Sequence, residues 1–169
     1  MRIKELLLLT IGATLAGSCF TINYSFKGAD IPPEITTVSV QYFNNRATRI
    51  EPTLSQNFTD ALKEYIESNT KLRIVNTIGD VDFSGEIKDY QISPAAITSG
   101  DVAAKTRFTI SVRVKYTNSV NPDENYDTEF SRYREFDSTE DFSSVEAGLT
   151  EEIIEEIIEQ IFNKTFVNW

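Results

Sequence analysis

The stretch "KTRFTISVRVKYTNSV", residues 105–120, decides the fold. Apolar and polar residues alternate along it, which is the period of a β-strand with one buried face. The apolar positions are Phe108, Ile110, Val112, Val114 and Tyr116, and the polar positions are Arg107, Thr109, Ser111, Arg113 and Lys115. This pattern predicts a sheet that is covered on one side and presents a polar face on the other, where a partner could contact it.

Neighbouring segments predict the strands that pair with this one. Residues 125–136 are expected to form an antiparallel partner, because Asn121-Pro122-Asp123 supplies a turn between the two strands. Residues 81–92 also alternate, but their apolar residues change parity, which indicates a bulge near Lys88–Asp89. Two further strands are expected at residues 36–43 and 72–76.

Two segments change to the helical period. Residues 53–68 and 143–162 each place their apolar residues on one face, and the second segment carries glutamates on the opposite face. Each begins with a pattern that resembles a capping box, Thr53 with Gln56 and Ser143 with Glu146. A helix this apolar on one side needs a sheet to cover, so we expect an α+β domain with both helices on one face of a mostly antiparallel sheet.

Composition excludes several classes of function. The 169 residues suffice for one domain, and the net charge of −10 disfavours general binding to nucleic acid. The chain has no histidine, one cysteine and no glycine-rich phosphate loop. No catalytic residue, cofactor or metal site is therefore expected. A hydrolase with paired carboxylates remains as an alternative, which would require two buried carboxylates facing each other in a cleft.

The N-terminal segment is typical of an exported protein. Arg2 and Lys4 precede an apolar stretch of about a dozen residues, whereas a membrane-spanning helix needs about 20. This arrangement predicts a signal peptide over residues 1–18. Its removal would change the net charge from −10 to −11, because the segment holds two basic residues and one acidic residue.

The residues that follow the signal peptide predict a lipid anchor. "LAGSC" at residues 15–19 resembles the bacterial lipobox, with Ala16 where leucine is usual. In that pathway Cys19 is acylated and becomes the new N-terminus, and several acyl chains hold a protein stably at a membrane surface. Residues 19–35 would then be a tether and residues 36–169 the folded domain. The alternative is a secreted protein with a free Cys19.

Five stretches in order resemble one family. A lipobox followed by "YSFKGADIPPEITTVSVQYF", "PTLSQNFTDALKEYI", "FSGEIKDYQISPAAI", "RFTISVRVKYTN" and "IFNKTFVNW" is similar to the LptE family of lipopolysaccharide-assembly lipoproteins, in the form found in Bacteroidota. The resemblance covers essentially the whole chain after the signal peptide. It implies a fold of two helices against a four-stranded sheet and a non-enzymatic function.

The resemblance also implies a location and partners. Members of the family are lipid-anchored in the outer membrane, face the periplasm, and plug and help to assemble the LptD β-barrel, through which lipopolysaccharide reaches the outer leaflet. Direct contact with lipopolysaccharide is a further implication. The alternative from another class is a stand-alone periplasm-facing lipoprotein that binds a lipid or a small ligand.

The phosphates of lipopolysaccharide would require a basic surface, which this acidic chain offers in one region. The residues concerned are Lys105, Arg107, Arg113 and Lys115, with Arg132 and Arg134 in the paired strand. A hairpin could bring the six into one patch that contacts phosphate or a barrel wall. The alternative is that they are solvated residues paired with local acids such as Asp127 and Glu129.

Overall fold

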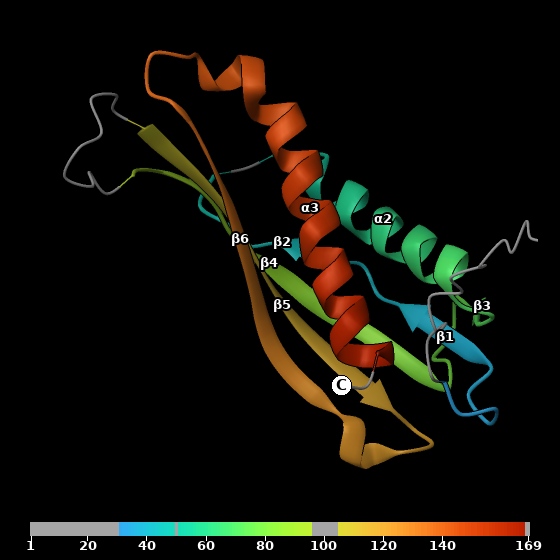
Figure 1. The fold of residues 1–169 in the computed structure, drawn as a ribbon. Helices are drawn as coiled ribbons and strands as arrows, with labels where there is room; N and C mark the ends of the chain where they lie inside the picture. Colours follow the sequence, from blue (N-terminus) through green and yellow to red (C-terminus); the bar gives the residue numbers. More distant parts are fainter. Residues whose placement is uncertain (1–30, 50, 96–104, 168–169) are drawn as a thin grey trace, which may run out of the picture.

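A computed structural model describes residues 31–49, 51–95 and 105–167. In it both helices lie on the same face of one sheet (Figure 1). The elements are β1 (Thr37–Val40), β2 (Asn44–Asn45), α2 (Leu54–Asn69), β3 (Arg73–Ile74), β4 (Val81–Pro94), β5 (Lys105–Asn118), the short 3-10 helix η1 (Pro122–Glu124), β6 (Tyr126–Asp137) and α3 (Phe142–Phe166). The predicted α+β class and the placement of both helices on one face are confirmed.

The sheet differs from the expected four-stranded, mostly antiparallel one. Six strands form a mixed sheet in the order β3-β1-β4-β5-β6, and β2 pairs separately with β4. The long strands β4, β5 and β6 are antiparallel, whereas β1 is parallel to both β3 and β4, and β2 is parallel to β4. The connection from β1 to β3 passes through α2, and such a crossover returns the chain in the same direction. β2 is only two residues long, which is too short to produce a periodic pattern.

The bulge expected in β4 is confirmed. The pairing between β4 and β5 shifts register between Ile87 and Asp89. Because of this shift, Phe83 and Ile87 before the bulge and Tyr90 after it all point into the core, although their positions differ in parity.

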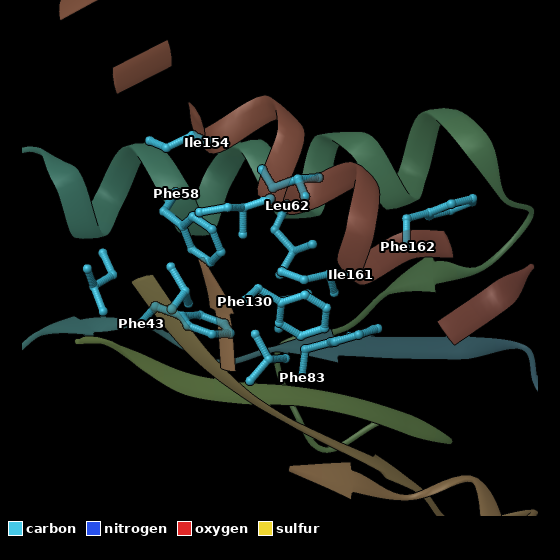
Figure 2. Packing of buried hydrophobic residues seen from close by; sticks show 14 of the residues in the cluster. Phe43, Phe58, Leu62, Phe83, Phe130, Ile154, Ile161 and Phe162 are labelled. Atoms are coloured by element: carbon cyan, nitrogen blue, oxygen red, sulfur yellow. The ribbon is translucent and has the colours of Figure 1, made fainter. Parts of the chain in front are cut away.

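The core fills the space between the helices and the sheet. Figure 2 shows Phe58 and Leu62 of α2 and Ile161 of α3 reaching toward Phe43 and Phe83 in the sheet layer. The rings of Phe43 and Phe58 meet edge to face, with their centroids 5.0 Å apart. The buried residues of α3 are five isoleucines followed by two phenylalanines, namely Ile153, Ile154, Ile157, Ile158, Ile161, Phe162 and Phe166.

Both predicted capping boxes are wrong. The Thr53 hydroxyl donates to Glu51 and makes no capping hydrogen bond to α2. α3 begins after Asp141, whose carboxylate accepts from the Ser143 amide at 3.2 Å. Glu146 instead accepts a hydrogen bond of 2.8 Å from the hydroxyl of Tyr90, a ring that is 1% exposed. A buried hydroxyl needs a partner, so this long-range contact prevails over the local cap.

The folded domain starts earlier than residue 36. Ile31 packs against the core, and the Ile35 amide donates to the Pro32 carbonyl at 3.0 Å in a turn that leaves Ile35 buried. The end of the segment predicted as a tether therefore belongs to the domain. Residues 1–30, with the predicted signal peptide and Cys19, lie outside the described residues.

Gly85 allows a close approach that no other residue would permit. An added Cβ would lie 2.7 Å from Cε1 of Phe43 and still closer to the Arg113 carbonyl oxygen of the paired strand. Gly148, on α3, has no heavy atom within 4 Å of the same position. The two glycines therefore form a matched pair for substitution.

We expect Gly85→Ala to lower the free energy of unfolding by about 1–3 kcal/mol through overpacking against backbone. Gly148→Ala should raise it by about 0.5–1 kcal/mol, because alanine favours a helix over glycine. Urea denaturation followed by circular dichroism measures both. Equal stability of Gly85→Ala and the wild type would contradict the packing described here.

Candidate functional site

The face of the sheet turned away from the helices is the candidate site, and we call it the open face. Alternate side chains of β5 and β6 form most of this face, and it continues over β4. Its side chains on the two strands include Lys105, Arg107, Thr109, Ser111, Arg113 and Lys115 of β5 and Asp127, Glu129, Ser131, Tyr133 and Glu135 of β6. The face is thus polar throughout, as the alternation in β5 predicted.

Arg113 is held by a carboxylate on the neighbouring strand. Its Nε and Nη2 atoms donate to the two carboxylate oxygens of Asp127, each at 2.8 Å. This two-point hydrogen bond lowers the pKa of Asp127 and raises that of Arg113. Such a planar pair is specific to arginine, and it leaves fewer donors of Arg113 for an external anion.

Arg107 is also engaged. It donates to Glu135 from Nε at 3.2 Å and from Nη2 at 2.7 Å, and its guanidinium lies over the ring of Tyr133, 4.0 Å from the centroid. Lys105 and Lys115 differ, because no acidic side chain of the described residues lies within ion-pair distance of either. The lysines are therefore the cations of this region that remain available to an anionic ligand.

The expectation of one basic patch is wrong, because the structure divides the six residues between two faces. Arg132 and Arg134 occupy even positions of β6, the parity of the buried Phe130 and Phe136, so they project toward α3. The odd positions of β5 project to the open face. Contact of any of the six with a ligand or partner stays a prediction.

The two arginines on the helix side are clamped to α3. Arg134 donates to Glu152 and to Glu156, each at 2.8 Å, and Arg132 donates to Glu156 at 3.1 Å. Hydrogen bonding to Arg134 lowers the pKa of Glu156. We call these four residues the edge clamp.

The edge clamp also engages the backbone of the outermost strand. The Nη1 atoms of Arg132 and Arg134 donate to the carbonyl oxygens of Ser131 and Tyr133, at 2.9 and 3.1 Å. β6 ends the sheet, so its outer carbonyls would otherwise be open to another strand. The clamp therefore protects the middle of this edge.

A groove between the first halves of α2 and α3 was not anticipated from the sequence. It has a volume of about 630 Å³, and Tyr90 forms part of its floor. Burial raises the pKa of the Tyr90 phenol well above its ordinary value. The acidic residues around it are Glu51, Asp60, Glu64, Glu146 and Glu151. Across the described ranges no three acidic or thiol side chains are placed to share a metal ion.

The fold is that of a class of small α+β domains found in several bacteria. The hypothetical protein CT253 from Chlamydia trachomatis is similar with a TM-score of 0.55 and 11% identity, over 79% of this chain and 99% of that one. The uncharacterized lipoprotein B from Nitrosomonas europaea is similar with a TM-score of 0.50 and 12% identity, over 76% of this chain and 80% of that one. A putative neuraminyllactose-binding hemagglutinin homolog from Helicobacter pylori is similar with a TM-score of 0.52 and 9% identity, over 83% of this chain and 88% of that one. At these identities the likeness concerns the fold alone.

Within this class the family is defined by the sequence. Residues 35–165 match the family model LptE, lipopolysaccharide-assembly, and the chain belongs to that family. No curated protein matches the chain. The family is a non-enzymatic one, and its role in lipopolysaccharide assembly extends to this protein. No helix among the residues described has the length and apolar character needed to cross a membrane.

The edge clamp generates a prediction about self-association. We expect the double substitution Arg132→Ser and Arg134→Ser to free the carbonyls of β6 and leave Glu152 and Glu156 unpaired, so that chains associate edge to edge. Sedimentation velocity should show a monomer for the wild type and concentration-dependent oligomers for the variant. Arg107→Ser, which removes an open-face arginine, should remain monomeric. A monomeric double variant with native circular dichroism would contradict the protective role.

Proposed function

We propose that this protein is a lipid-anchored, periplasm-facing lipoprotein of the outer membrane that plugs an LptD-like β-barrel and assists its assembly. In this role it supports the transport of lipopolysaccharide to the outer leaflet. Membership of the LptE family supports the proposal. The structural observation that carries it is the polar open face, on which Arg107 and Arg113 are neutralised by acids of β6.

The open face suits the interior of a barrel. The lumen of an outer-membrane barrel is polar, so a domain inside it needs polar surfaces on all sides. The helix layer meets this need with the glutamates of α3, and the open face meets it with paired charges. Pairing within the domain limits the cost of taking these charges out of bulk water.

The anchor is part of the same proposal. A signal peptide over residues 1–18 would direct export, and acylation of Cys19 would hold the domain at the membrane that contains the barrel. The described domain begins about a dozen residues after Cys19, so the anchor and the barrel are within reach of one another.

We assign contact with lipopolysaccharide to the two lysines of β5. Arg107 and Arg113 would have to leave a carboxylate before binding a phosphate, whereas Lys105 and Lys115 would not. Lys115 lies beside the Arg113–Asp127 pair and lowers the pKa of Asp127 through its charge. We therefore propose Lys115, with Lys105 at the far end of β5, as the phosphate-contacting residues.

Affinity purification of the full-length protein from detergent-solubilised membranes tests the main proposal. We expect an outer-membrane β-barrel to be recovered with it and identified by mass. In cells that lack the barrel, the variant Cys19→Ala should leave the membrane fraction. In cells that contain the barrel, the same variant should still co-purify with it, because the lipid and the plug are separate attachments. Recovery of the protein without a barrel would contradict the proposal and favour a stand-alone lipoprotein that binds a lipid or a small ligand.

Charge reversal tests the lysine assignment. Lys115→Glu should weaken binding of purified lipopolysaccharide by about fivefold, since an exposed charge contact contributes about 1 kcal/mol. Lys63→Glu, which makes the same change of charge on α2, is the matched control and should bind as the wild type does. Titration calorimetry at two salt concentrations measures both variants. Equal affinities for the two would remove Lys115 from the site.

A further inference from the structure

A groove lies where the chain enters the domain. It has a volume of about 750 Å³ and runs between the turn at residues 31–36 and the end of α2 with β3. Apolar side chains line part of it, and two basic residues lie at its rim. They are Ile31, Pro32, Pro33 and Leu72, with Lys71 and Arg73. Apolar surface in contact with water favours an occupant that covers it.

The sheet has an unfilled edge beside this groove. The amides of Arg73 and Val75 donate to the carbonyls of Thr36 and Val38, at 3.0 and 2.9 Å. Because successive amides of a strand point in opposite directions, the Ile74 amide is directed away from β1. β3 is the last strand of the sheet on this side in the part of the chain that the structure describes. An additional strand could therefore pair here.

The sequence supplies a segment that fits both features. Residues 20–26 read "FTINYSF", with apolar residues at the even positions and small polar residues between them. This is the pattern of a strand with one face to bury. Residues 27–30, "KGAD", join it to Ile31 and are typical of a turn. The five residues from Phe26 to Ile31 can span about 17 Å, enough to return along the groove.

We propose that residues 20–26 dock beside β3 and cover this groove with Phe20, Ile22, Tyr24 and Phe26. The polar residues Thr21, Asn23 and Ser25 then continue the polar open face by one more strand. The segment is joined to the groove by four residues, so its effective concentration there is in the millimolar range, which favours it over a separate molecule. The docking is a property of this chain and does not depend on the barrel of the proposed function.

The docked segment would change the role of the lipid anchor. Cys19 directly precedes Phe20, so an acylated Cys19 would be held at the β3 corner of the sheet. The end of the sheet that carries β3 would then face the membrane, and the end at Pro94 and Lys105 would point away from it. The anchor would set the orientation of the domain as well as its location.

Disulfide cross-linking tests the docking in residues 19–169, with Cys19→Ser to leave only the introduced thiols. Ser25→Cys combined with Lys71→Cys, at the rim of the groove, should cross-link under mild oxidation, because docking brings the two within disulfide range and Ser25 is not one of the residues that cover the groove. Ser25→Cys combined with Glu140→Cys is the control, since Glu140 is exposed at the other end of the sheet. Equal yields for the two pairs would overturn the proposal.

Hydrogen exchange supplies a second readout that needs no introduced thiol. The Ile74 amide of the Cys19→Ser chain should exchange at least about tenfold more slowly than in the variant Tyr24→Ser with Phe26→Ser. Asn23→Ala with Ser25→Ala, at the polar positions, should keep the slow exchange. The Val112 amide in the core should be unaffected in all three chains. Fast exchange of the Ile74 amide in the unsubstituted segment would overturn the proposal.

Discussion

The burial of one face of β5 is the constraint on which the rest of the structure depends. β5 pairs with β4 on one side and β6 on the other, and Phe108, Ile110, Val112 and Val114 are fully buried beneath the helices. Burial of these residues forces every alternate side chain onto the open face. The charges of that face are therefore a consequence of the core, and each arginine on it has a carboxylate partner across the strand.

Local periodicity predicted the elements whose apolar residues lie on one buried face within a continuous segment of the chain. The alternation in β5, the change of parity in β4 and both helices were readable, because burial imposes a period on long elements. Parallel pairing of β1 and the short strand β2 depend on contacts distant in sequence, and a two-residue strand carries no period. The sequence predicted a capping box from Ser143 to Glu146, whereas Asp141 caps α3. Glu146 instead accepts a hydrogen bond from the buried hydroxyl of Tyr90, which lies 56 residues away in the sequence.

The candidate site was predictable in composition but less so in arrangement. The division of the basic residues between the two faces of the sheet was predictable from the sequence, since Arg132 and Arg134 share the parity of Phe130 and Phe136. Their acidic partners could not, because Glu152 and Glu156 meet them only where α3 crosses β6. Carboxylates on the same strand, such as Asp127, Glu129 and Glu135, lie on the opposite face. Proximity along a strand is therefore a poor guide to ion pairing in this sheet.

The edge clamp also determines when, during synthesis of the chain, the edge of the sheet becomes protected from pairing with other strands. Its glutamates follow its arginines by 18 to 24 residues, so during synthesis or export β6 emerges before the residues that guard it. In that interval the outer carbonyls of the sheet are open to any passing strand. A chaperone that binds extended segments would have its greatest effect on this protein before α3 has docked.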